Sequence, residues 1–419
     1  MGFLNSEKII VGYDLGNEYS QISFSRSEAG EVETISQVAG TEIYNIPTVL
    51  CKRNGVNQWY YGKEAVRYGE EQQGILVDNL LELALDGEPV LIDGESFEPI
   101  ALLTLFFKRS LGLLSQVAPS DKIEALMITC DVLDHRILDI LNQIVAGIHM
   151  KGITIAFQNH TESYYCYMIH QPKELWTYQS VLFDYRGSCI KAYRMECNKR
   201  TTPIVAFIEE RDFPFPQRES TKDTEELDNR FLQIAGEVCE GKLIGSVFLI
   251  GDGFEQEWMK ESLRFLCKNR RVFQGNNLFS KGACFGMQER LNASEVGKEY
   301  VFLGNEKLKA NIGMKIMRQG EESYYAILDA GVNWYEAEHE MEFYISDGNE
   351  MNLQITPLIG KNGKLAQIVL EDFPGPIARL KARFYLEAEN LLVVEIEDLG
   401  FGEIRPAAGR SWKEKIELY

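Results

Sequence analysis

Three glycine-containing turns, each after an apolar strand-like run, constrain this chain more than any other feature. The first covers residues 14–20 (Asp-Leu-Gly-Asn-Glu-Tyr-Ser), the second residues 184–189 (Asp-Tyr-Arg-Gly-Ser-Cys), and the third residues 251–253 (Gly-Asp-Gly). The strand–turn–strand around Asp14 is echoed by the one around Asp184. Glycine lets backbone N–H groups approach phosphate oxygens, and two opposed aspartates suit a hydrated Mg²⁺. The third turn, before a helix, suits a nucleoside lying against bare backbone.

Each turn also has a purely structural interpretation. Asp14 and Asp184 are residues of the kind that end a strand, and Gly251-Asp252-Gly253 meets the need for a tight strand-to-helix turn. The ordered set of three turns, with helical patterns between them, is more specific than any single turn. The set predicts a nucleotide cleft, either working or vestigial.

Charge and composition exclude several classes of protein. The chain has 419 residues and a net charge of −20, the opposite of the basic footprint that nucleic acids or anionic membranes require. No stretch approaches the roughly 18 consecutive apolar residues of a membrane helix, and the start lacks the basic region of a signal peptide. Eight cysteines are scattered without a metal-ligand or disulfide pattern, so we expect a reducing cytoplasm.

Residues 1–297 are predicted to form an α/β domain with mixed sheets. Continuous or alternating apolar runs predict strands, and apolar residues at helical spacing predict helices. The polar stretch Glu209–Glu225, which contains Pro214 and Pro216, is predicted to be a surface loop. The predicted strands are 9–13, 21–25, 48–51, 59–61, 123–130, 153–157, 180–183, 190–195 and 246–250, and the predicted helices are 97–117, 138–145, 161–170, 226–239, 255–267 and 280–288.

The pattern changes near residue 297, and we place the domain boundary at 297–306. Residues 307–419 show short alternating strands separated by turn residues, which is typical of a β-sandwich. Asn362-Gly363 is the strongest hairpin signal because both residues tolerate positive φ.

In this layout the sequence resembles the actin-like ATPase superfamily, and most closely the seventy-kilodalton heat-shock chaperones. The family's first phosphate turn reads Asp-Leu-Gly-Thr-Thr-x-Ser and is partly matched by residues 14–20, and Gly251-Asp252-Gly253 stands at its adenosine turn. Residues 377–396 look like the late hairpin of the chaperone substrate domain, and residues 413–418 like its last strand. The resemblance covers nearly the whole chain. It implies a two-lobed ribonuclease-H-like domain followed by a β-sandwich similar to the substrate-binding domain.

The resemblance also implies ligands and site residues. It implies ATP or ADP with Mg²⁺, held through water by Asp14 and Asp184, which are also the candidate catalytic residues. It implies a protein or peptide segment bound by the β-domain, for which strand addition is one mode. The cofactor contacts implied are Asp14, Gly16, Asn17, Tyr19, Asp184, Arg186, Gly187, Ser188, Gly251, Asp252 and Gly253.

Several departures from the family pattern bear on activity. Arg186 and Ser188 place side chains where bare backbone lies against phosphate, Glu18 places a carboxylate where a Thr faces the γ-phosphate, and Asn159 replaces a Glu. Residues 66–99 and the segment between Arg211 and Glu225 are too short for full peripheral subdomains, and the family's helical lid is absent. We therefore expect hydrolysis to be weak or lost.

Three hypotheses follow. The first is a lidless chaperone relative with a degenerate, pseudo-ATPase nucleotide module coupled to a β-domain that binds a protein segment. The second is an active ATP hydrolase with a rebuilt site, in which Glu18 or Arg186 supplies compensating chemistry. The third is an actin-like scaffold or filament subunit without catalysis. The five histidines have no metal-ligand spacing and are predicted to be structural or solvated.

Overall fold

The computed structural model describes residues 8–26, 30–38, 40–150, 152–217, 223–255, 257–346, 348–358 and 363–418. Its backbone contacts divide the chain into unit 1, residues 1–301, and unit 2, residues 302–419. This division falls within 297–306, the range in which the sequence predicts a boundary.

Unit 1 contains a first sheet with the strand order β11-β10-β1-β2-β3. Strand β1 runs antiparallel to β2 and parallel to β10, and β10 runs parallel to β11. Every residue of β1 is buried, because strands on both sides and a helix on one face cover it, and this accounts for its continuous apolar run. The strands are β1 (Ile9–Asp14), β2 (Tyr19–Ser25), β3 (Glu33–Thr34), β10 (Ile123–Cys130) and β11 (Thr154–Asn159), and the short β4 (Ile46–Pro47) also pairs with β2.

The second sheet of unit 1 repeats this arrangement. Its order is β16-β15-β12-β13-β14-β17, in which β12 runs antiparallel to β13, β13 antiparallel to β14, and β12, β15 and β16 are parallel. Asp14 pairs with Gln21 across the first hairpin, and Asp184 pairs with Lys191 across the second. The two predicted turns therefore occupy equivalent places in two similar sheets. The strands are β12 (Gln179–Arg186), β13 (Cys189–Asn198), β14 (Ile204–Pro214), β15 (Ile244–Ile250), β16 (Arg271–Gln274) and β17 (Tyr300–Phe302).

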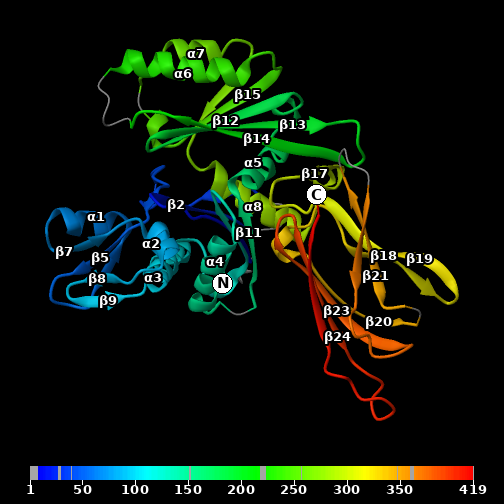
Figure 1. Cartoon of the computed structure of the whole chain (residues 1–419). Helices are drawn as coiled ribbons and strands as arrows, with labels where there is room; N and C mark the ends of the chain where they lie inside the picture. Colours follow the sequence, from blue (N-terminus) through cyan, green and yellow to red (C-terminus); the bar gives the residue numbers. More distant parts are fainter. Residues whose placement is uncertain are drawn as a thin grey trace, which may run out of the picture. The chain divides into compact units, whose positions relative to one another are not determined.

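Helices follow the parallel strands of both sheets. Helices α4 (His135–Ile148) and α5 (His160–Ile169) follow β10 and β11, and α8 (Leu278–Leu291) follows β16. Helices α6 (Thr224–Cys239) and α7 (Glu261–Leu266) cover one face of the second sheet, where Phe231 and Trp258 join its buried core (Figure 1).

Helix α8 packs against the first sheet and against α5. Ala283 and Met287 share a buried cluster with Ile10 of β1. A Cβ atom at Gly282 would lie 1.9 Å from the backbone oxygen of Ser163 in α5, so only glycine allows this close approach. The short helix α9 (Glu295–Glu299) leads into β17.

Residues 50–111 build a small subdomain on the first half of unit 1. The sequence predicts that residues 66–99 are too few for a full peripheral subdomain, and they form only short elements, including one hairpin (Figure 1). The elements are β5 (Leu50–Arg53), β6 (Trp59–Tyr61), α1 (Gly62–Glu70), β7 (Gly74–Val77), α2 (Leu80–Asp86), β8 (Val90–Ile92), β9 (Glu95–Phe97) and α3 (Pro99–Leu111).

The structure corrects three element predictions. The loop predicted over Glu209–Glu225 is wrong for its first part, because β14 extends to Pro214, and residues 218–222 lie outside the described residues. The side chains of β14 beyond residue 206 are exposed or half-buried, and the part from Glu209 onward is mostly polar, although residues 204–208 form an apolar run. Strand β16 was not predicted. Helix α7 begins at Glu261, after a 3₁₀ turn over residues 252–254.

Unit 2 consists of two four-stranded antiparallel sheets, β19-β18-β21-β22 and β20-β23-β24-β25. Strands β21 and β22 pair on either side of the predicted Asn362-Gly363 hairpin, but residue 362 lies outside the described residues. The strands are β18 (Ala310–Arg318), β19 (Glu321–Leu328), β20 (Glu338–Ile345), β21 (Glu350–Pro357), β22 (Lys364–Val369), β23 (Ala378–Ala388), β24 (Leu391–Asp398) and β25 (Ser411–Glu417).

Alternate residues of β21 and of most of β23 are buried, as expected for strands that cover a core on one face. The opposite face of β20 and β23 carries cross-strand ion pairs between glutamates and basic residues. Lys381 lies 2.9 Å from Glu340, and Arg379 lies 2.7 Å from Glu342. Among the described residues of the whole chain, no helix is both long enough and apolar enough to span a membrane.

Candidate functional site

The two predicted aspartates lie close together, linked by one side chain. Asp14 ends β1 and is fully buried, and Asp184 lies near the end of β12 and is 5% exposed. The guanidinium of Arg186 lies near both, because its Nε donates to Oδ1 of Asp184 at 3.0 Å and its Nη2 lies 4.0 Å from Oδ2 of Asp14. The ends of the two sheets therefore meet through an arginine placed beside both carboxylates.

Aromatic rings hold the Arg186 guanidinium in place. Its central carbon lies 4.8 Å from the ring centre of Tyr19 and 5.6 Å from that of Phe279 in α8. A guanidinium is planar and weakly hydrated, so it stacks on aromatic faces more readily than an ammonium group does. Stacking and ion pairing together fix the arginine in a site from which water is largely excluded.

A second series of polar contacts, through His160 and Lys191, joins the two sheets beside Asp14 and Asp184. His160, the first residue of α5, donates from Nε2 to Oδ1 of Asp14 at 2.8 Å, and its Nδ1 lies 3.8 Å from Oδ1 of Asp131. Asp131 follows β10 and accepts from Nζ of Lys191 in β13 at 2.6 Å. His160 also stacks on Phe279, with ring centres 3.9 Å apart. We call Asp14, Asp131, His160, Asp184, Arg186 and Lys191 the charge cluster.

Burial and neighbouring charges shift the pKa values of the cluster in opposite directions. Burial raises the pKa of Asp184, although Arg186 opposes this shift. Burial alone would lower the pKa of Arg186, but Asp184, Tyr19 and Asp14 outweigh it and raise that pKa. Burial would raise the pKa of Asp131, but His160 and Lys191 outweigh it and lower that pKa. Arg186 is therefore a permanent cation.

Two buried oxygens of the site remain without hydrogen bonds. Oδ2 of Asp14 and the hydroxyl of Tyr19 have no hydrogen-bond partner among the described residues. Nη2 of Arg186 lies 4.0 Å from Oδ2 of Asp14, beyond hydrogen-bond range. Oδ2 of Asp14 is therefore a buried acceptor without a hydrogen bond within the part of the chain that the structure describes. An acceptor of this kind costs about 1–3 kcal/mol of stability.

The glycines at the turns are packed against neighbouring atoms. Gly187 adopts φ +53°, and a Cβ atom there would lie 3.2 Å from Oε1 of Glu18, so the two turns touch. Gly251 adopts φ +93°, and a Cβ atom there would lie 2.3 Å from the backbone oxygen of Tyr185. Both positions demand glycine for reasons internal to the protein.

The remaining residues that were predicted to contact a cofactor have different surroundings. Asn17 is engaged at the start of α2, where its Nδ2 donates to Oδ1 of Asn79 at 3.0 Å. Gly16 lies near the Arg186 guanidinium, since a Cβ atom there would be 3.7 Å from Nη1. Gly253 faces the ring of Tyr185. Ser188 and Asp252 are exposed.

Sequence reasoning missed half of the charge cluster. His160, predicted to be structural or solvated, bonds directly to Asp14, and Asp131 and Lys191 were not predicted as site residues. One signal for them exists in the sequence, because Asp131 and His160 directly follow the strands that run parallel to β1. Parallel neighbours bring their carboxyl ends to the same sheet edge as Asp14.

A metal site of several protein ligands is not formed in the described part of the chain. No group of three or more His, Cys, Asp or Glu side chains there is placed to hold a metal ion. Asn159, where the chaperone pattern has a Glu, caps α5 by accepting from the backbone N–H of Glu162 at 2.9 Å. Its side chain is therefore committed to the helix.

Comparison with known families gives two matches. Residues 31–305 match a family of unknown function, DUF5716, in its C-terminal part, and residues 307–418 match a domain of unknown function, DUF8552. The two matches meet close to the division between units 1 and 2. No match was found among curated proteins.

Proposed function

The chain belongs to the DUF5716 family, and we propose that its unit 1 is a pseudo-ATPase, an actin-like domain that keeps the two aspartates but does not hydrolyse ATP. We propose that unit 2 carries the binding activity, toward an extended segment of a partner protein. One observation carries the proposal. The Arg186 guanidinium, 3.0 Å from Asp184 and 4.0 Å from Asp14, lies where a metal-bound phosphate would have to approach both carboxylates.

The repeated sheet order supports the actin-like part of the proposal. Two sheets of the same order and strand directions, each with an aspartate at the end of its central strand, are what the resemblance to the chaperones implies. Helices α5 and α8 also pack closely against each other, so the two halves share one interior.

The residues present do not fit Mg·ATP bound as the resemblance implies. The Asp184 carboxylate is paired with Arg186, and Asp14 is bonded to His160 through Oδ1. The other oxygen of Asp14, Oδ2, has no hydrogen bond to any described residue, but the Arg186 guanidinium lies 4.0 Å from it, so a hydrated metal ion between the two carboxylates would have to displace Arg186. Glu18 touches Gly187 at the place of the phosphate turn. Two like charges about 4 Å apart repel by roughly 4 kcal/mol at an effective dielectric of 20, so a phosphate beside Glu18 is strongly disfavoured.

The charge cluster gives unit 1 an internal substitute for a bound nucleotide. The pairs Arg186–Asp14 and Lys191–Asp131 each join the second sheet to the first. In a nucleotide-dependent domain a ligand would make such links and release them on hydrolysis. Here the chain's own side chains make them, so the proposal predicts one conformation that does not respond to nucleotide.

The test combines Mg·ATP calorimetry, a phosphate-release assay and hydrogen exchange on the whole chain. We expect no saturable binding heat, no phosphate release above the blank, and identical exchange of β1 and β12 with and without Mg·ATP. Stoichiometric binding with turnover that Asp14→Asn abolishes would overturn the proposal. Binding without turnover would overturn only the claim that the cluster replaces the ligand.

The binding activity of unit 2 needs its own measurement. A library of extended peptides, titrated with the full chain and followed by fluorescence anisotropy, should contain peptides that bind saturably. In NMR spectra of the full chain, these peptides should shift backbone amide signals of unit 2. An absence of binders, or signals that move only in unit 1, would contradict this assignment.

A further inference from the structure

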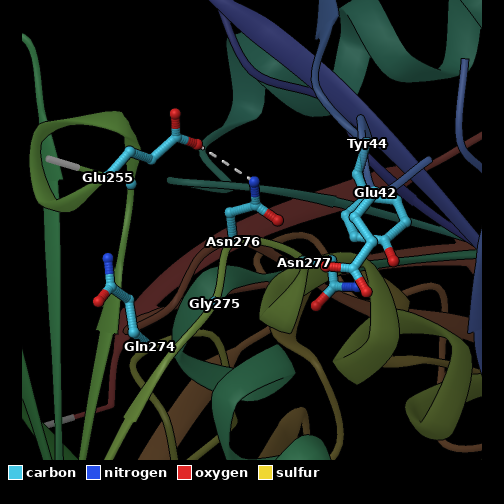
Figure 2. Close-up of a pocket in the computed structure, with 8 residues that line it drawn as sticks. Glu42, Tyr44, Glu255, Gln274, Gly275, Asn276 and Asn277 are labelled. Carbon is cyan, nitrogen blue, oxygen red and sulfur yellow. Dashed lines mark hydrogen bonds between the residues drawn. The ribbon is translucent and has the colours of Figure 1, made fainter.

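A pocket of about 340 Å³ lies beyond the ends of β15 and β16. In Figure 2, Glu255 and Gln274 lie on one side, Glu42 and Tyr44 on the other, and Asn276 between them. Strands β15 and β16 are parallel, and ligands of open α/β sheets bind at the carboxyl ends of parallel strands. The lining residues are Glu42, Tyr44, Gly251, Glu255, Gln274, Gly275, Asn276 and Asn277.

Two amide groups of the pocket each use one of their two N–H donors within the protein. Nε2 of Gln274 donates to the backbone oxygen of Phe254 at 2.5 Å, and Nδ2 of Asn276 donates to Oε1 of Glu255 at 3.4 Å (Figure 2). A carbonyl or a carboxylate oxygen accepts but does not donate, so these partners fix which end of each amide faces them. Each amide oxygen and the second N–H of each amide remain for a ligand.

Nδ2 of Asn277 donates to Oγ1 of Thr34 at 2.9 Å. The pocket also carries the carboxylates of Glu42 and Glu255, two formal negative charges. Helix α8 begins after Asn277, and a helix N-terminus contributes only about half a positive charge. The pocket is therefore acceptor-rich and negative, which disfavours phosphate and favours a ligand with several N–H donors.

An aromatic side chain lies beside the carboxylates of the pocket. Burial and the neighbouring Glu42 raise the pKa of the Tyr44 phenol, consistent with the two side chains being neighbours in Figure 2. Behind the pocket wall, Gln21 is fully buried, donates to the backbone oxygen of Asn276 at 2.6 Å, and leaves its Oε1 without a partner among the described residues. Carboxylates beside an aromatic ring are the chemistry that recognises organic cations.

We propose that this pocket binds a guanidinium group. A guanidinium is planar, presents five N–H donors, pairs with carboxylates in a bidentate manner and stacks on aromatic rings, so it matches two carboxylates, amide oxygens and Tyr44 together. With only two carboxylates, the pocket suits an organic cation better than a bare metal ion. The source is either a free guanidine compound or an arginine side chain of a protein. The inference does not rest on the pseudo-ATPase proposal, because the pocket uses other side chains than the charge cluster.

Calorimetry on the full chain tests the proposal with three probes. Agmatine represents the free cation, a blocked Gly-Arg-Gly peptide represents a protein side chain, and methylurea is a neutral planar control. We expect one-to-one binding of agmatine that weakens as salt rises, and no binding of methylurea. Tighter binding of the peptide than of agmatine identifies a protein partner, and the reverse identifies a small molecule. Equal binding of methylurea, or no saturable heat with either cation, overturns the proposal.

Matched variants separate the pocket from the general negative charge of the protein. Glu255→Gln should raise the agmatine Kd by about fivefold, the upper range for one exposed ion pair, and Glu42→Gln/Glu255→Gln should remove measurable binding. Glu88→Gln, an exposed carboxylate after α2, should leave the Kd unchanged. Tyr44→Phe should retain binding, and Tyr44→Leu should weaken it severalfold. Thermal melting checks that each variant folds, and wild-type affinity in a folded double variant overturns the site.

Discussion

Replacing Arg186 by alanine should destabilise unit 1 strongly. The side chain of Arg186 is 21% exposed, and its partners Asp184 and Asp14 are 5% and 0% exposed, so the change leaves two buried carboxylates without their shared cation. Removing one member of a buried ion pair typically costs about 3–5 kcal/mol. We expect that loss in the free energy of unfolding, which corresponds to a Tm lower by roughly 6–20 °C.

The loss of stability in Arg186→Ala should depend on pH, and the pKa of Asp184 gives its direction. Burial raises the pKa of Asp184 and Arg186 lowers it, so the pKa rises further in Arg186→Ala. A carboxyl whose pKa is higher in the folded than in the unfolded state stabilises the fold when protonated. This contribution is present below the unfolded pKa of about 3.9 and is lost as pH rises through the folded pKa. The deficit of the variant should therefore be larger at pH 7 than at pH 5.

Urea denaturation at both pH values measures the effect. Arg186→Lys keeps the charge but loses the planar fork and the stacking on Tyr19, so it should fall between wild type and alanine. Arg264→Ala is the control, since that side chain is 77% exposed and paired only with exposed Glu261, and it should cost less than about 1 kcal/mol. An Arg186→Ala protein as stable as wild type at pH 7, or a deficit that grows as pH falls, would refute the reasoning.

Three further changes test other parts of the fold. Gly282→Ala forces a Cβ atom against the backbone of α5, and calorimetric melting should show a loss of about 1–3 kcal/mol from overpacking. Asp228 is buried and accepts from the Ser262 hydroxyl and from the first backbone N–H groups of α7. Burial would raise its pKa, but the Ser262 hydroxyl and these backbone bonds outweigh burial and lower the pKa. Asp228→Ala should therefore cost about 1–2 kcal/mol near neutral pH, and the difference from wild type should vanish in acid, below the lowered pKa of Asp228. Lys381→Met breaks an exposed ion pair with Glu340 and should leave the Tm unchanged within error. A clear fall in Tm would show that the cross-strand ion pairs of β20 and β23 stabilise the fold.

The parts of the fold that the sequence predicted are those with strong local signals. Strands β1, β12 and β15 are continuous buried apolar runs ending in turn residues, and such runs have few alternative structures. The second half of β14, residues 209–214, was predicted to be a loop because its mostly polar side chains are exposed or half-buried; the apolar residues 204–208 of the same strand carried a strand signal that the prediction did not use. In the sequence, the similarity of the two sheets was visible only because the strand–turn–strand pattern around Asp14 recurs around Asp184. The strand order was not visible, since it depends on pairings between residues far apart in the chain.

The candidate site also has residues that a local sequence pattern predicted and residues that no local pattern predicted. Asp14, Asp184 and Arg186 were found because each belongs to a turn with a local pattern. His160 was not, because its role depends on β10 inserting between β1 and β11 and bringing the start of α5 to the end of β1. No spacing in the sequence encodes that neighbourhood. The same applies to the pocket, whose walls join residues 42–44 to residues 251–277.

The similarity of the two sheets explains why one arginine is able to fill the site. Arg186 stands two residues after Asp184, and the equivalent position after Asp14 is Gly16. A Cβ atom at Gly16 would lie 2.4 Å from the backbone oxygen of Tyr19, so this position requires glycine, and it would lie 3.7 Å from Nη1 of Arg186, an ordinary contact. One half of the repeat thus supplies the cation and the other half leaves room for it, so that two carboxylates that would repel each other share one permanent charge. A site built for a metal would need both turns bare; the asymmetry between Gly16 and Arg186 is the physical reason to regard this one as closed by its own side chains.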